Sequence, residues 1–146
     1  MHKILPVIFI IIWILLVAAL SGNAQTGQPN QPLTRILFVF DGSQSMMGNW
    51  DSDKKINVAR NILKSMVDSL QQVDNVELAL RVYGHQSIVP PQDCSDTRLE
   101  VPFGRNNGQQ IKDKLSKIDP KGTTPIAKSL ELAASDFTAC DNCRNI

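Results

Sequence analysis

The chain has 146 residues and a formal net charge of +1, from 15 basic and 14 acidic side chains. This length allows one domain at most. A nearly neutral chain with mixed charges lacks both the basic footprint of a nucleic-acid-binding protein and a polybasic patch for anionic lipid. We therefore expect neither nucleic acid nor a charged lipid surface as a partner.

Residues 1–24 have the layout of a secretory signal peptide. A short basic start precedes an apolar run over residues 4–20, and small residues come after it at Gly22 and Ala24. We predict cleavage after Ala24 and export to the periplasm, the cell surface or the medium. The apolar run is slightly shorter than the ~20 residues that span a bilayer, so an uncleaved N-terminal anchor is the alternative.

The next segments predict the start of a folded domain. Residues 25–34 are polar with Gly and Pro, which indicates a linker to one domain over residues 35–146. Residues 35–40, R-I-L-F-V-F, form a short and largely apolar run that suits a central strand covered on both faces. Apolar side chains on one face predict a helix over residues 54–72, with capping supplied by residues 51–53.

Alternation over residues 75–83 predicts a second strand, which we expect to be more exposed than the first. Residues 84–97 then form a long loop with a Pro-Pro pair. If the two strands run parallel, this loop lies at their carboxyl ends and forms part of a recognition rim; a plain connector is the alternative. Residues 98–103 read as a short strand, and Pro102 makes it an edge strand.

The last third of the chain alternates in the same way. Apolar spacing marks a short helix ending at Ile118, and Thr124-Pro125 open another helix over residues 124–137, with Thr124 at the N-cap. Residues 144–146 read as the start of a further strand. The order of elements predicts an α/β fold, a Rossmann-like three-layer sandwich with a mostly parallel central sheet and one antiparallel edge strand. Because this sheet is thin, we expect the domain to be incomplete at its C-terminus.

A polar cluster, D-G-S-Q-S over residues 41–45, ends the first strand. In open α/β sheets ligands bind outside the carboxyl ends of the strands. If the chain stays extended, Asp41, Ser43 and Ser45 share a direction. One carboxylate and two hydroxyls are hard oxygen ligands, which suit Mg²⁺, Mn²⁺ or Ca²⁺ rather than zinc. An ordinary turn is the alternative, because Asp, Gly and Ser are common turn residues.

Two motifs in the right order resemble the von Willebrand factor type A domain family. They are D-G-S-Q-S-M after a hydrophobic strand and G-T-T-P-I-A-K-S-L further along the chain. The segments A-R-N-I-L-K at residues 59–64 and R-V-Y-G-H at residues 81–85 are also similar, and the likeness is to exported bacterial members. The resemblance covers residues 35–146.

In that family Asp-x-Ser-x-Ser, a distant Thr and a later Asp form a metal-ion-dependent adhesion site. The resemblance implies Mg²⁺, or Mn²⁺ or Ca²⁺, with one coordination position open for an Asp or Glu carboxylate of a protein partner. The implied function is metal-dependent protein binding without catalysis. The implied ligands are Asp41, Ser43, Ser45 and Thr124, with Thr123 as the alternative to Thr124. The family's later Asp-Gly motif has no counterpart before Ile146.

Two other functions compete with this interpretation. A structural or channel-associated subunit of a membrane assembly would share the metal site and differ in the sequence after residue 146. A hydrolase is less well supported, because Ser43 stands where aspartyl-phosphate enzymes usually place a second acid. His85 is the only histidine outside the signal that could serve a serine nucleophile, and the chain has no G-x-S-x-G elbow.

Five further residues are candidates for contact or cross-linking. Trp50 could be an exposed aromatic anchor beside the metal, or an apolar residue that covers a helix. His85 comes after the second strand and could lie on the same partner-contact rim or have a structural role. A metal-ligand role is less well supported, because zinc sites need three or four ligands. Three cysteines in an exported chain predict a disulfide, but their odd number leaves at least one without a partner in this chain. They are Cys94, Cys140 and Cys143, and the sequence leaves their connectivity open.

Overall fold

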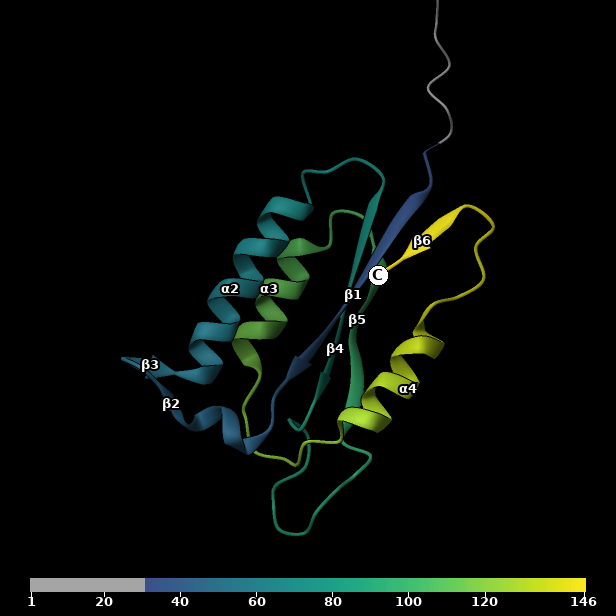
Figure 1. The fold of residues 1–146 in the computed structure, drawn as a ribbon. Helices are drawn as coiled ribbons and strands as arrows, with labels where there is room; N and C mark the ends of the chain where they lie inside the picture. The colour runs from purple at the N-terminus through teal and green to yellow at the C-terminus, as the bar shows by residue number, and fades with distance from the viewer. Residues whose placement is uncertain (1–30) are drawn as a thin grey trace, which may run out of the picture. The chain divides into compact units, whose positions relative to one another are not determined.

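The computed structural model of the chain describes residues 31–146. The predicted signal peptide and most of the predicted linker lie outside the described residues. The elements, drawn in Figure 1, are in chain order β1 (Leu33–Asp41), η1 (Gln44–Met47), β2 (Asn49–Trp50), β3 (Asp53–Lys54), α2 (Lys55–Leu70), β4 (Val76–Tyr83), β5 (Thr97–Gly104), α3 (Gly108–Lys117), α4 (Ile126–Asp136) and β6 (Cys143–Asn145).

The central sheet has four strands in the order β5-β4-β1-β6. β1 pairs in parallel with both β4 and β6, whereas β4 and β5 are antiparallel. This confirms the predicted α/β fold with a mostly parallel sheet and one antiparallel edge strand. The register of β1 with β4 ends with Asp41 opposite Tyr83, so the carboxyl ends of these two strands lie side by side.

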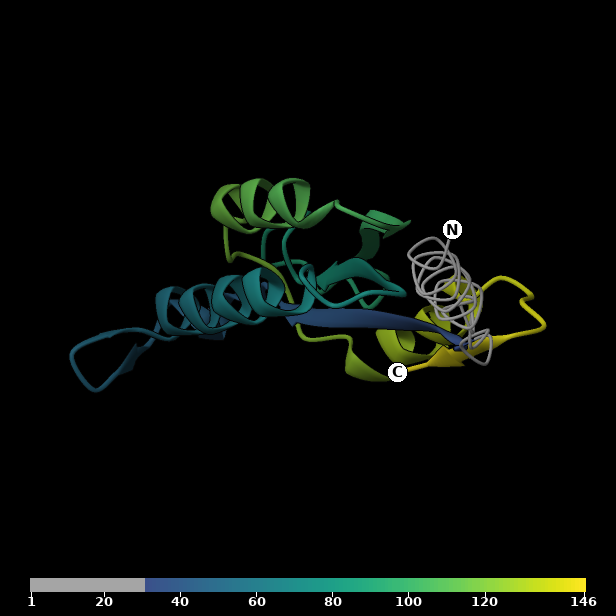
Figure 2. The same ribbon diagram turned by 90° about the horizontal axis from the view of Figure 1, so that it is seen from above.

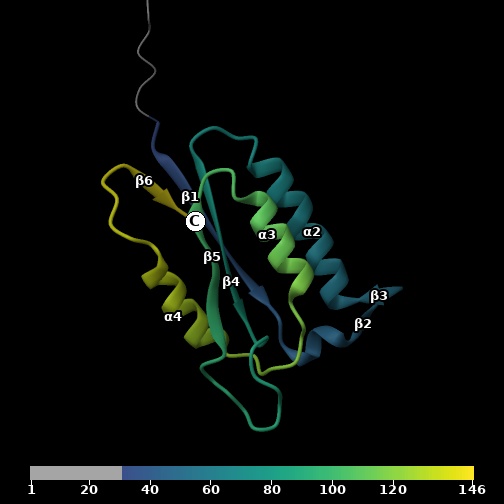
Figure 3. The same cartoon turned by 180° about the vertical axis from the view of Figure 1, so that it is seen from behind.

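Helices cover both faces of this sheet. α2 and α3 pack side by side on one face, and α4 lies on the other (Figures 2 and 3). Burying one large aliphatic side chain in such a layer stabilises the fold by about 1.5–3 kcal/mol. Among the helices of residues 31–146, none is long and apolar enough to cross a membrane. The main cluster between the sheet and α2 and α3 consists of Phe40, Ile56, Leu63, Val67, Leu78, Leu80, Val82, Val101, Ile111, Leu115 and Ile118.

The two central strands are buried in the opposite order from the one predicted. Residues 78–83 of β4 are all buried, whereas most of β1 is only half-buried. The expectation that the second strand would be more exposed than the first is therefore wrong. β4 lies between two full-length strands, while β1 has only the three-residue β6 on its other side.

The predicted side-chain caps are not seen. α4 begins at Ile126, after Pro125, and no side chain caps its N-terminus. Thr124 instead accepts the N–H of Ile126 with its backbone carbonyl, at 2.9 Å. α2 likewise has no side-chain cap, so the expected capping by residues 51–53 is wrong. The hydroxyl of Thr124 is thus not engaged by its own helix.

Cys140 and Cys143 form a disulfide in the turn between α4 and β6, and Cys94 is free and exposed. A disulfide was expected, and the structure selects this pair from the alternatives that the sequence leaves open. β6 pairs with the start of β1, at residues 33–35. Cys94 lies in the loop after β4, at the opposite end of the sheet (Figure 1). This placement separates it from the bonded pair.

Candidate metal-binding site

The polar cluster after β1 is a turn held by its own side chains. Asp41 accepts the backbone N–H of Ser43 with its Oδ1 atom, at 2.7 Å. η1 begins directly after Ser43, so the chain turns instead of staying extended, and the hydroxyl groups of Ser43 and Ser45 are hydrogen-bonded to each other with their oxygen atoms 3.0 Å apart. The turn and the ligand cluster are therefore compatible interpretations, because the turn itself brings the hydroxyl groups together.

The loop before α4 reaches this turn through its backbone. Ser43 and Gly122 form an isolated parallel bridge, and the N–H of Gln44 donates to the carbonyl of Gly122 at 2.9 Å. The two motifs of the sequence, far apart along the chain, thus lie side by side. Thr124 comes two residues after Gly122, so the bridge carries it towards the serine cluster.

The two adjacent threonines are held differently. Thr123 donates its hydroxyl to the backbone carbonyl of Asp93, in the loop after β4. The exposed Thr124 has no hydrogen-bond partner for its hydroxyl within residues 31–146. Because the Thr123 hydroxyl is turned towards the Asp93 carbonyl, whereas Thr124 is exposed and its hydroxyl can turn to an incoming cation, this arrangement favours Thr124 over Thr123 as the ligand.

Glycines allow three loops to cross at this point. Gly84 has φ +71°, and a Cβ atom there would lie 2.3 Å from the carbonyl oxygen of Thr123 and 2.7 Å from Cα of Ser43. A Cβ on Gly122 would lie 2.5 Å from Oδ2 of Asp96. Only glycine tolerates both the left-handed backbone and such close packing. The sequence contains these glycines, but their role becomes visible only in the folded chain.

The donor set fits a divalent cation. Mg²⁺ binds oxygen ligands at about 2.0–2.1 Å in an octahedron, which sets neighbouring ligands about 3 Å apart. The hydroxyl oxygens of Ser43 and Ser45 have this separation, 3.0 Å, and belong to the hard oxygen class. No group of three or more His, Cys, Asp or Glu side chains within residues 31–146 is placed to hold a metal. The hydroxyl-rich cluster beside Asp41 is therefore the candidate site.

Tyr83 lies against Asp41. It is the partner of Asp41 in the parallel register, so both side chains project to the same face at the ends of their strands. Burial raises the pKa of Tyr83 most, and the charge of Asp41 and a hydrogen bond to it raise the pKa further, to about 12. The phenol stays protonated beside the carboxylate at neutral pH.

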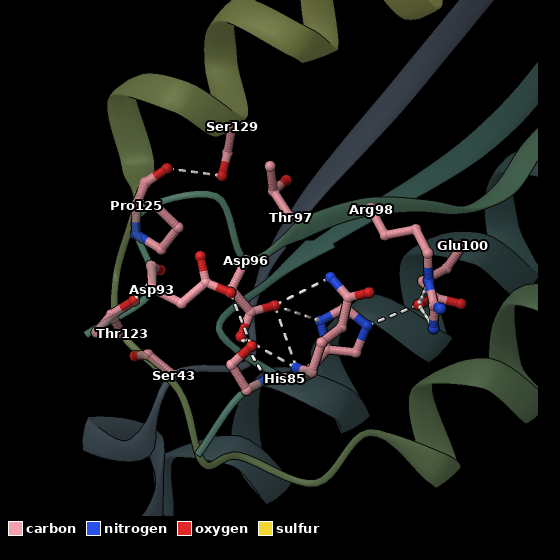
Figure 4. Close-up of polar contacts among 12 residues, drawn as sticks. Ser43, His85, Asp93, Asp96, Thr97, Arg98, Glu100, Thr123, Pro125 and Ser129 are labelled. Carbon is pink, nitrogen blue, oxygen red and sulfur yellow. Dashed lines mark hydrogen bonds and ion pairs between the residues drawn. The ribbon is translucent and has the colours of Figure 1, made fainter. Parts of the chain in front are cut away.

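The loop after β4 packs against two acidic side chains, Asp96 and Glu100, that sequence reasoning did not single out (Figure 4). Nε2 of His85 is hydrogen-bonded to Oε1 of Glu100 at 2.6 Å, and its Nδ1 atom lies 4.0 Å from Oδ1 of Asp96. The side chain of His85 is only 8 % exposed. A direct partner contact does not fit this burial, because the imidazole lies beneath the loop. The sequence signal that could have pointed to this arrangement is the pair of acids in C-S-D-T-R-L-E.

Trp50 has the opposite environment. It is 66 % exposed, in the β2–β3 hairpin after η1. Its role in partner binding stays a prediction, but the indole is not used to cover a helix. Beside it, a depression of about 320 Å³ lies between η1, α2 and the loop that leads to Gly122. The residues that line this depression are Met47, Asp53, Lys54, Ile56, Asn57, Arg60, Ile118, Asp119 and Pro120.

Solved structures share this fold. The pilus adhesin SpaC from Lactobacillus rhamnosus GG superposes with a TM-score of 0.60 at 21% identity, over 79% of this chain and 14% of SpaC. The vWF domain of the type V pili tip protein Mfa5 from Porphyromonas gingivalis superposes with a TM-score of 0.56 at 16% identity, over 80% of this chain and 37% of that chain. At these identities, the likeness is one of fold.

Sequence comparison adds the family. The Bacillus subtilis (strain 168) protein YwmD is 33% identical over 112 residues, which are 74% of this chain and 49% of YwmD. The chain thus spans about half the length of this relative. Residues 36–143 match the family model of the von Willebrand factor type A domain. On this match, and on the two motifs that the fold brings together, the chain belongs to the von Willebrand factor type A domain family.

Proposed function

We propose that this domain is an exported protein-binding module whose binding depends on a divalent cation, Mg²⁺ or else Mn²⁺ or Ca²⁺. The observation that carries this proposal is the 3.0 Å separation of the Ser43 and Ser45 hydroxyl oxygens, next to a carboxylate anchored in the same turn. The residues that would hold the cation are Asp41, Ser43, Ser45 and Thr124.

The proposed ligands have different roles at this site. Asp41 anchors the turn by accepting the N–H of Ser43, and the buried Ser43 is held by its bridge to Gly122. Ser45 and Thr124 are exposed, so we expect a partner to approach from their side. When bound, the cation supplies a positive charge that neutral hydroxyls leave largely uncompensated, which attracts a carboxylate of the partner.

Export and adhesion have independent support. A disulfide such as Cys140–Cys143 persists in an oxidising compartment, which agrees with the secretory signal predicted at the N-terminus. Two of the structures with this fold come from proteins described as a pilus adhesin and a pili tip protein. These likenesses favour a binding module over an enzyme. We expect the partner to be a protein that presents an Asp or Glu side chain.

Metal titration of the purified chain tests this proposal. We expect Asp41→Asn to lower the affinity for Mg²⁺ and Mn²⁺ at least about tenfold, measured by calorimetry, because it removes the only charged ligand. Asp74→Asn is the matched control, since Asp74 is exposed in the turn before β4, at the other end of the sheet. Equal affinities of the two variants would contradict the assignment.

A second measurement tests the open coordination position. Water-proton relaxation of the Mn²⁺-loaded chain reports exchangeable water on the metal, and acetate serves as a probe for the partner's carboxylate. We expect acetate to lower the relaxation enhancement, and we expect Asp74→Asn to respond as the wild type does. An enhancement that acetate leaves unchanged would show that no position is open to a carboxylate.

A further inference from the structure

Asp96 is a buried carboxylate whose partners are mostly N–H groups. It is 1 % exposed, and Nδ1 of His85 lies 4.0 Å from its Oδ1 atom. The N–H of Gln86 donates to both carboxylate oxygens at 3.1 Å, and the N–H of Ser87 donates to Oδ2 at 3.0 Å (Figure 4). The side-chain amide of Gln86 adds a bond of 3.0 Å to Oδ1. Such donors offset the cost of burying an ionised carboxylate.

This carboxylate also packs against the loop that pairs with the serine cluster. A Cβ atom on Gly122 would lie 2.5 Å from Oδ2 of Asp96, so the two groups are in direct contact. The backbone carbonyl of Asp96 accepts the N–H of Gly84 at 2.9 Å, and the carbonyl of Gly84 accepts the N–H of Gly122 at 2.8 Å. Asp96 therefore contacts both glycines that touch Ser43.

We propose that Asp96 is a positioning residue of the metal-binding site. It holds the loop after β4 in the shape that supports Gly122, and Gly122 in turn holds Ser43 and sets the path of the chain to Thr124. Asp96 is not a ligand itself, because its oxygen atoms are buried behind Gly122 and already accept four hydrogen bonds. This inference rests on the function proposed above.

An asparagine at this position separates positioning from ligation. Asp96→Asn keeps the size of the side chain and every proposed metal ligand. Oδ1 of Asp96 accepts from the backbone and side-chain N–H groups of Gln86, and Oδ2 accepts from the backbone N–H groups of Gln86 and Ser87, so the NH₂ group of an asparagine would face a donor whichever way the amide turned. We expect the loop to shift relative to Gly122 as these bonds rearrange. We expect metal affinity to fall although no ligand has changed.

Asp93 provides the matched control. It lies in the same loop, but its carboxylate accepts bonds from the Ser87 hydroxyl at 2.7 Å and from the N–H of Ser95 at 2.8 Å. Asp93→Asn makes the same change of charge three residues away and leaves the contact with Gly122 intact. Ile111→Val, in α3 of the core, controls for a general loss of stability.

The experiment compares these variants in the full chain, with Mn²⁺ or Mg²⁺ alone as the probe. Calorimetry at a temperature at which all variants are folded gives the affinity. We expect Asp96→Asn to lower it about 10-fold or more, as loss of a supporting residue does at other metal sites. Asp93→Asn and Ile111→Val should stay close to the wild type. If the wild type binds the metal ion and Asp96→Asn binds it with equal affinity, the inference is wrong.

Hydrogen exchange provides a readout that needs no metal. The N–H of Gln44 donates to Gly122 across the bridge, so its protection reports whether Gly122 is in place. We expect faster exchange at Gln44 in Asp96→Asn and unchanged exchange in Asp93→Asn. If the wild type bound no metal, the proposed function would fail, yet unchanged protection at Gln44 would still refute the role of Asp96.

Should Asp96→Asn fail to fold, Gln86→Ala replaces it. This variant keeps the carboxylate and removes only the side-chain donor at 3.0 Å. Faster exchange at Gln44 than in the exposed-loop control Gln92→Ala would support the inference, and equal exchange would refute it.

Discussion

The backbone of Ser43 forms a single parallel bridge with that of Gly122, and this bridge joins the loop after β1 to the loop before α4. Next to it, the N–H of Gln44 donates to the Gly122 carbonyl at 2.9 Å. The proposed ligands thus come from two loops whose relative position depends on very few bonds. Some substitutions in these loops should therefore lower the metal affinity, and others should lower the free energy of unfolding.

The two adjacent threonines should separate these effects. Thr124→Ala removes a hydroxyl without a hydrogen-bond partner among the described residues, so we expect a loss of Mg²⁺ affinity of about tenfold or more with little change in stability. Thr123→Ala breaks the bond to the Asp93 carbonyl and should lower the free energy of unfolding by about 1 kcal/mol, with a smaller loss of affinity. Calorimetry and urea unfolding of both variants measure this. The reverse order of affinities would make Thr123 the ligand.

Gly84→Ala should be strongly destabilising. Gly84 has φ +71°, and the added Cβ would lie 2.3 Å from the backbone carbonyl oxygen of Thr123. Left-handed strain and overpacking together should lower the free energy of unfolding by more than about 2 kcal/mol. Gly48→Ala is the control, because its φ is −64° and the nearest atom to an added Cβ is 3.3 Å away. Similar urea midpoints for the two variants would refute this crossing of loops.

Glu100 should make the fold sensitive to acid. Burial alone would raise the pKa of Glu100, but bonds from Lys114, His85 and Arg98 outweigh it and hold the pKa at about 2. The folded pKa is below the ordinary value of 4.5, so the stabilisation is complete above that value and is lost as pH falls from 4.5 towards 2. It amounts to at most about 3 kcal/mol.

Urea unfolding from pH 7 to pH 2 measures this contribution. We expect the difference in stability between the wild type and Glu100→Gln to shrink steadily below pH 4.5. Glu131→Gln is the control, because Glu131 is largely exposed and, among the described residues, pairs only with Lys128 one helical turn away. A difference for Glu100→Gln that stayed constant over this range would show that its carboxylate is not held by these three groups.

Tyr83 should titrate late in alkaline solution. It is the only tyrosine of the chain, so absorbance near 295 nm reports this residue alone. We expect a midpoint near pH 12 in the folded protein and the ordinary value near 10 in urea. Asp41→Asn should lower the folded midpoint without bringing it down to 10, because burial is the larger cause. A midpoint that Asp41→Asn leaves unchanged would place the phenol away from this carboxylate.

The sequence predicted the elements well where the pattern is local. The apolar run at residues 35–40 and the one-sided helix at residues 54–72 correspond to β1 and α2, with bounds shifted by at most a few residues. The edge position of β5 could be inferred from Pro102, since an edge strand can dispense with one N–H. The relative burial of β1 and β4 was wrong, because burial depends on which strands flank each one in the sheet.

In the candidate site too, contacts between neighbouring residues were predictable, whereas contacts between distant segments were not. The contact of Asp41 with the N–H of Ser43 joins residues two apart, so the D-x-S-x-S motif was sufficient to predict that these groups lie together. For His85 the sequence left a partner-contact rim and a structural role open. Its contacts with Glu100 and Asp96 favour the structural role. Both acids stand in C-S-D-T-R-L-E, but their meeting with His85 depends on how β5 pairs with β4.

By itself, then, the sequence determined the family, the order of the main elements and the grouping of Asp41, Ser43 and Ser45 after the first strand. Only the tertiary structure decided that these residues form a turn and that Gly122 bridges Ser43. It also decided that the hydroxyl of Thr123 is engaged while that of Thr124 has no partner among the described residues, and that Asp96 contacts Gly122. The reason is the separation of the contacting residues along the sequence. A turn closes through bonds between neighbouring residues, whereas crossing loops meet only after the sheet has aligned the carboxyl ends of β1 and β4.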